Sequence, residues 1–268
     1  MMFAWIRRSI GGIFAMNRSI MYTSWFVHAK PRTHAKLRLF CFASAGHGGN
    51  IYTGWNAYLP SSIELYPLEL PGRGPHITRP AYTHLAPLID EISFIIRPAL
   101  TKPFAFFGHS MGGLVAFTLA SQLRRQRLPE PAHLFVSATH APHLRDARPK
   151  IHHLPEAESL AQLQHYQGDL HHMLGNSELK NLMLPTLRAD FSVCETYTYT
   201  SDEPLTLPIS AYGGLQDQTC SRQDLVSWQY YTNSSFNLHM FEGDHFYWFK
   251  NTSALVTHIA RIITAQYV

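Results

Sequence analysis

The chain has 268 residues, of which 46% are hydrophobic, 13% aromatic and 15% charged, and its formal net charge at pH 7 is +4. This length suits one α/β domain with a full core, and the composition excludes disordered and coiled-coil proteins. The 22 lysines and arginines are scattered along the chain, which argues against binding to nucleic acid.

Residues 1–24 form an N-terminal extension that carries Arg7, Arg8 and Arg18 and no acidic residue. Its apolar run, residues 10–16, is much shorter than the ~20 residues of a membrane-spanning helix. It also lacks the small-residue cleavage site of a signal peptide. We therefore expect a poorly ordered tail, no stable membrane insertion and a cytoplasmic location.

The three cysteines, Cys41, Cys194 and Cys220, are odd in number, far apart and in no CxxC pattern. This spacing argues against a disulfide framework and against a zinc site. A reducing compartment therefore fits best.

The first half of the chain begins with a strand pattern. Residues 37–44 read as a buried strand that runs into the small-residue turn 45–49. A second strand is predicted at 63–68 and is stopped by the Pro- and Gly-containing segment 70–74. An amphipathic helix follows, because apolar residues recur at helical spacing at Leu85, Leu88, Ile89, Ile92, Ile95 and Ile96.

A strand at 104–107, a tight turn, a helix at 114–125 and a strand at 133–136 come next. Alternation of strands and helices indicates a mostly parallel sheet with helices on both faces. The fold class is thus α/β.

The strand pattern stops between about residues 150 and 195, where short helix-like pieces suggest an inserted helical lid. Strands resume at 208–212 and 236–241, and a helix at 252–265 closes the chain. We expect one domain over residues 25–268, with the lid as its insertion.

The most informative motif is G-x-S-x-G at residues 108–112, which lies directly between a predicted strand and a predicted helix. In that context the motif is typical of the nucleophile turn of an α/β hydrolase, so Ser110 is the candidate nucleophile. Gly108 and Gly112 allow the sharp turn, and the N-terminus of the following helix lies close to the serine.

A serine nucleophile requires a base, and the base requires an orienting acceptor. In this fold the chain order is serine, acid, histidine. Asp217 follows the strand 208–212, and His245 follows the strand 236–241, so both are expected at the sheet edge where Ser110 lies. They are the candidate acid and base.

Three alternatives are weaker. His109 adjoins the nucleophile, but neighbours on such a turn point apart, which favours a packing or gating role. Asp244 adjoins His245 and is expected in a solvated turn. No carboxylate at ligand spacing accompanies five clustered histidines, which favours a surface or lid role over a metal site: His152, His153, His165, His171 and His172.

The oxyanion formed on attack requires two backbone N–H donors. One is expected from Met111, the residue after the nucleophile. The other is expected in the loop after the first strand, near Ser44 in segment 42–46.

An ordered series of segments resembles the type II thioesterases of polyketide and nonribosomal peptide assembly lines, which are similar to the animal medium-chain fatty-acyl thioesterase. The resemblance covers the chain from about Trp25 to the C-terminus. The segments are LFCFASAGHGG (39–49), LELPGRG (68–74), PFAFFGHSMGGLVAF (103–117), HLFVSATHAPHL (133–144), LPTLRADFSVCETY (184–197), PISAYGGLQDQ (208–218) and FEGDHFYW (241–248).

The resemblance implies an α/β-hydrolase fold with a lid and hydrolysis of acyl thioesters from the phosphopantetheine arm of acyl or peptidyl carrier proteins. Ser110, Asp217 and His245 fall on the positions of the family's triad. No separate cofactor is implied, because the substrate itself carries the phosphopantetheine, and we expect a monomer.

The chain departs from the family at Ala43 and Ser44, where relatives usually have proline and then an aromatic residue, and at His47, where they usually have glycine. The residues alone leave a carboxylesterase or lipase open, and also an acyltransferase with the same triad. A catalytically idle binding protein is a third alternative, which the complete triad argues against.

Overall fold

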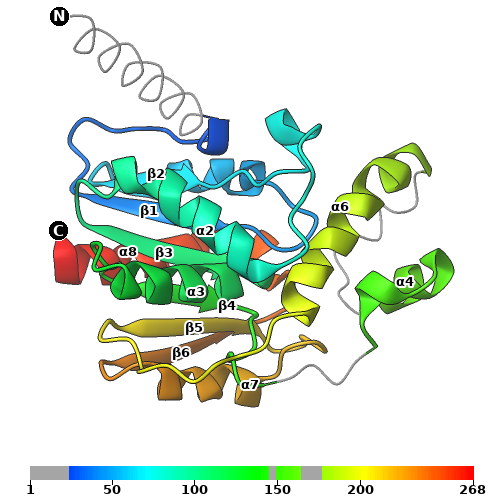
Figure 1. Cartoon of the computed structure of the whole chain (residues 1–268). Helices are drawn as coiled ribbons and strands as arrows, with labels where there is room; N and C mark the ends of the chain where they lie inside the picture. The colour runs from blue at the N-terminus through cyan, green and yellow to red at the C-terminus, as the bar shows by residue number, and fades with distance from the viewer. Residues whose placement is uncertain (1–23, 145–148, 164–176) are drawn as a thin grey trace, which may run out of the picture.

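The structure, a computed structural model, describes residues 24–144, 149–163 and 177–268. Its centre is a six-stranded sheet in the order β2-β1-β3-β4-β5-β6, and every pairing between these strands is parallel (Figure 1). The strands are β1 (Leu37–Phe42), β2 (Ile63–Pro67), β3 (Phe104–His109), β4 (Leu134–Ser137), β5 (Ile209–Gly214) and β6 (Phe236–Phe241).

Helices cover both faces of this sheet. The α-helices are α2 (Leu85–Ile96), α3 (Met111–Arg125), α4 (Glu156–Leu163), α6 (Ser177–Glu195), α7 (Arg222–Val226) and α8 (Thr252–Tyr267). Shorter 3₁₀ turns lie at Gly49–Ala57, Gly74–His76, Arg97–Ala99, Ile151–His153, Ser227–Tyr231 and Tyr247–Phe249. No helix in the described part of the chain is both long and apolar enough to cross a membrane.

Side-chain alternation along the central strands divides the core into two layers. Phe104 and Phe106 of β3 pack in the layer that includes α2 and α3. Ala105 and Phe107, on the other face, pack in the layer that includes α8. Strands buried on both faces read as continuous apolar runs, and the predicted α/β architecture with helices on both faces is confirmed.

The element boundaries differ from the sequence predictions by a few residues. The third strand continues to His109, and α3 begins at Met111 rather than at residue 114. The two glycines Gly112 and Gly113 thus belong to the first turn of the helix, where close packing rather than helix propensity decides the structure.

Between β4 and β5 the described residues form α4 and α6, which Figure 1 shows on the side of the molecule opposite the C-terminus. Residues 164–176 of the predicted lid lie outside the described residues, and so do residues 1–23 of the N-terminal extension. The described chain enters the core at once, because Trp25 is fully buried and Phe26 nearly so.

Candidate active site

Ser110 is the single residue between β3 and α3. Its backbone angles are φ 54° and ψ −120°, a conformation that non-glycine residues seldom adopt and that is found most often at functional sites. Its N–H donates to the carbonyl of Ser137 over 2.8 Å, and its carbonyl accepts from Thr139 Oγ1 over 2.8 Å. The strand β4 and its following loop therefore hold the strained turn in place.

The glycines of the motif allow the backbone to approach closely. A Cβ atom at Gly108 would lie 2.0 Å from the carbonyl oxygen of Gly112, and one at Gly112 would lie 2.0 Å from that of Phe42. Any larger residue would push α3 away from β1 and β3. The G-x-S-x-G spacing is thus a packing requirement of this strand-to-helix turn.

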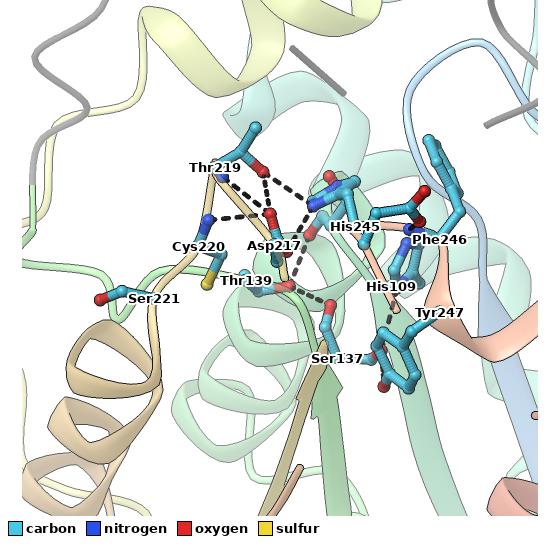
Figure 2. A network of polar contacts seen from close by, with 12 residues as sticks. His109, Ser137, Thr139, Asp217, Thr219, Cys220, Ser221, His245, Phe246 and Tyr247 are labelled. Carbon is cyan, nitrogen blue, oxygen red and sulfur yellow. Dashed lines mark hydrogen bonds and ion pairs between the residues drawn. The ribbon is translucent and has the colours of Figure 1, made fainter. Parts of the chain in front are cut away.

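Asp217 and His245 come from the loops after β5 and β6. Asp217 Oδ2 lies 2.9 Å from His245 Nδ1, and both side chains are almost completely buried. The other carboxylate oxygen, Oδ1, accepts from Thr219 N (2.7 Å), Thr219 Oγ1 (2.8 Å) and Cys220 N (3.1 Å) (Figure 2). Every one of these contacts orients the carboxylate toward the imidazole ring.

The surroundings of Asp217 keep its side chain ionised. Burial by itself would raise the pKa of this carboxyl group, but the hydrogen bonds and charge of His245 and the donors of Thr219 outweigh it. Together they lower the pKa from 3.8 to about 2. The carboxylate therefore stays negative beside the imidazole at neutral pH.

Thr219, which the sequence analysis missed, touches both members of the pair. Its Oγ1 lies 2.8 Å from His245 Nδ1 as well as 2.8 Å from Asp217 Oδ1. These two contacts, and the one between His245 Nδ1 and Asp217 Oδ2, are all satisfied when the hydroxyl donates to Asp217 and Nδ1 carries the ring proton. That tautomer leaves the lone pair of His245 on Nε2, the atom needed in a general base. No sequence motif marks Thr219 apart from its place two residues after the aspartate.

A cavity of about 430 Å³ brings Ser110, Met111 and His245 together. Thr219 and Cys220 line it as well, and residues at the end of α6, including Phe191 and Cys194, form part of its wall. The three predicted residues from the turn after β3 and the loop after β6 thus face one space that has room for a substrate.

The loop after β1 reaches the cavity at Ala45. Ala45 lines the cavity, whereas Ser44 is 2% exposed and its hydroxyl lies 3.0 Å from Nδ1 of His47. The Ser44 side chain is thus engaged within the loop.

His109 points into the core. Its Nδ1 lies 2.9 Å from Ser137 Oγ, which lies 2.6 Å from the hydroxyl of Tyr247, and its ring centroid is 5.1 Å from that of His245. Burial, followed by the neighbouring charge of His245, holds the pKa of His109 well below 6.5. The ring is a neutral packing partner of His245, in agreement with the packing role expected of it.

One group of metal-ligand types comes together in the described residues: the ligand atoms of His140, Cys220 and Asp224 lie within 4.8 Å of one another. Asp224 Oδ2, however, already accepts from both the N–H and the hydroxyl of Ser221, in the capping box of α7. The carboxylate acts as a helix cap. Of the clustered histidines, His152 pairs with Glu195, and His165, His171 and His172 lie outside the described residues.

Residues 37–267 match the family described as "Thioesterase domain". Linear gramicidin dehydrogenase LgrE of Brevibacillus parabrevis is 40% identical over 91% of this chain and 94% of its own. Gramicidin S biosynthesis protein GrsT of Aneurinibacillus migulanus is 37% identical over 88% and 93%. The solved structure of the RedJ thioesterase from the prodiginine pathway of Streptomyces coelicolor superposes with a TM-score of 0.79, at 32% identity over 89% of this chain and 92% of RedJ.

Proposed function

Because this chain belongs to the thioesterase family, and resembles its type II members from nonribosomal peptide and polyketide pathways, we propose that it hydrolyses acyl groups from the phosphopantetheine arm of a carrier protein. The observation that carries this proposal is the shared cavity of Ser110 and His245, with Asp217 bonded to the far side of the imidazole ring. LgrE is named a dehydrogenase, but the family match and the site chemistry of this chain are those of a hydrolase. We therefore propose no dehydrogenase activity for it.

In the proposed acylation step, Ser110 Oγ attacks the thioester carbonyl carbon while His245 Nε2 takes the hydroxyl proton. Asp217 holds the tautomer and stabilises the imidazolium that forms. The carbon–sulfur bond then breaks, the pantetheine leaves as a thiol with the proton from His245, and the acyl group stays on Ser110 as an ester.

Deacylation repeats the same chemistry with water. His245 Nε2 takes a proton from water, the resulting hydroxide attacks the acyl-Ser110 ester, and the serine leaves with that proton. The products are the free carboxylic acid and the regenerated enzyme. A thioester suits this site because its thiolate leaving group needs little acid assistance.

Two backbone N–H groups are proposed to bind the oxyanion. Met111 is the first residue of α3, so its N–H lacks an intrahelical partner and lies at the positive end of the helix. The second donor comes from the loop after β1, where Ala45 faces the cavity beside Met111. The N–H groups of Ser44 and Ala45 are both candidates for this second donor, because their peptide groups adjoin.

The acyl group is proposed to lie in the cavity against the apolar side chains at the end of α6, such as Phe191. The carrier protein would then deliver its arm from the side of the insertion between β4 and β5. A carboxylesterase or an acyltransferase could use the same triad, and it would differ in preferring oxygen esters or an acceptor other than water.

Hydrolysis rates across a panel of acyl groups on carrier protein, on coenzyme A and on simple esters would test the proposal. We expect carrier-bound thioesters to have the highest kcat/KM. Ser110→Ala should abolish labelling by a fluorophosphonate and lower turnover by several orders of magnitude. A preference for oxygen esters, or a variant with more than about a tenth of the wild-type rate, would contradict it.

A further inference from the structure

A buried ion pair links α6 to the loop after β2. Arg73 Nη2 lies 2.7 Å from Asp190 Oδ1, and Arg73 Nη1 donates to Asp190 Oδ2 over 2.7 Å, although the residues are 117 positions apart. Both side chains are less than a tenth exposed. Such two-pronged pairing between guanidinium and carboxylate fixes direction as well as distance.

The same pair binds two backbone groups of one turn. The N–H of Gly46 donates to Asp190 Oδ2 over 2.8 Å, and the carbonyl of His47 accepts from Arg73 Nη1 over 2.9 Å. The turn itself is closed by a 3.1 Å bond from His47 N to the carbonyl of Ser44, with Gly46 at φ 77°. Arg73, Asp190 and the turn thus form a closed ring of hydrogen bonds.

Ala45 lies in the middle of this turn and lines the catalytic cavity with Ser110 and Met111. A second buried carboxylate, Glu69, accepts from the N–H of Gly49 over 2.7 Å and anchors the far end of the loop. The loop proposed to bind the oxyanion is therefore held at its cavity end by a residue of the insertion.

We infer that Asp190 is a positioning residue for the oxyanion hole. Its hydrogen bond to Gly46 sets where the adjoining peptide groups of Ser44 and Ala45 point. Donors to an oxyanion must lie within about 2.7–3.1 Å of the charged oxygen. A displacement of the turn by even ~1 Å therefore weakens the hydrogen bonds to the oxyanion. This inference rests on the oxyanion role proposed above for the loop.

Removing Asp190 alone would leave Arg73 buried and unpaired, which could unfold the protein. A matched pair of double variants avoids this difficulty. Arg73→Met with Asp190→Asn removes both charges and keeps a side-chain oxygen for Gly46. Arg73→Met with Asp190→Leu removes both charges and that oxygen. The two proteins should have similar melting temperatures and differ at the turn.

Binding of an acyl trifluoromethyl ketone provides the readout, because its adduct with a serine mimics the tetrahedral oxyanion. We expect the leucine variant to lose about 10- to 100-fold in kcat and in ketone affinity relative to the asparagine variant, with KM unchanged. A structural role without positioning would change the melting temperature and leave the ratio of ketone affinity to KM the same.

Equal kcat and equal ketone affinity in the two double variants would overturn the inference. Failure of the proposed function has a different signature, since the wild-type protein would then prefer oxygen esters or another acyl acceptor, or would hydrolyse no carrier thioester, whatever the two double variants do. Loss of ketone binding on Ser110→Ala in the wild-type background would separate the two cases before the double variants are measured.

Discussion

The carboxylate of Asp217 lies 2.9 Å from Nδ1 of His245 across 28 positions of sequence, whereas the sequence neighbour Asp244 uses its Oδ1 to accept from the N–H of Phe246. The two carboxylates that the sequence offers to His245 thus have different partners. One orients the imidazole ring, and the other caps the turn that follows it.

Asp217→Asn should therefore lower turnover by roughly 10³- to 10⁴-fold. The neutral amide would stabilise the wrong tautomer of His245, and it has no charge to stabilise the imidazolium. The Asp244→Asn variant is the matched control and should retain most of its activity. Steady-state kinetics on a carrier-bound thioester would measure both. The reverse ranking would show that the acid has been misassigned.

The lowered pKa of Asp217 predicts a contribution to stability that acid removes. Its pKa is about 2 in the folded protein against 3.8 as the ordinary value, so ionised Asp217 stabilises the fold above pH 3.8. That contribution, about 2 kcal/mol for this shift, falls away as the pH drops toward 2. Urea unfolding should show the stability difference between wild type and Asp217→Asn shrinking between about pH 4 and pH 2. A difference that does not change with pH would contradict the assignment.

Thr219→Val should lower kcat by roughly 5- to 10-fold, since it removes one hydrogen bond to each of Asp217 and His245 while keeping the side-chain volume. Asp217 would keep its backbone donors, so the loss should be far smaller than in Asp217→Asn. Thr219→Ser restores the hydroxyl and should recover most of the rate. Serine and valine variants of equal activity would show that the hydroxyl has no part in orienting the pair.

Deleting the residues before Met21 should leave an active enzyme, because the buried side chains of the described chain begin with Trp25. A deletion that extends through Phe26 should destabilise the fold by several kcal/mol, since two buried aromatic side chains are lost. Thermal unfolding and thioesterase activity of the two truncated proteins would test this. Loss of folding in the shorter deletion would place required contacts upstream of Met21.

Local patterns in the sequence were enough to predict the architecture and the nucleophile. The strand β3 reads as an apolar run over residues 104–107 because it is buried on both faces, and the helix Leu85–Ile96 follows from apolar residues at helical spacing. The G-x-S-x-G motif predicted Ser110 because only glycine fits where β3, α3 and β1 come into contact. Chain order then predicted Asp217 and His245, since parallel strands bring their carboxyl ends to one edge.

Tertiary structure alone decided the contacts between segments that are distant in sequence. No periodic or motif signal predicts that Thr219 contacts His245, that Ala45 lines the cavity, or that Asp190 accepts from Gly46. Each depends on close approach between separate segments, such as the 2.8 Å from Thr219 Oγ1 to His245 Nδ1 and the 2.8 Å from Gly46 N to Asp190 Oδ2. Such distances are set by how the sheet, α6 and the loops pack together, and no short stretch of sequence contains that information.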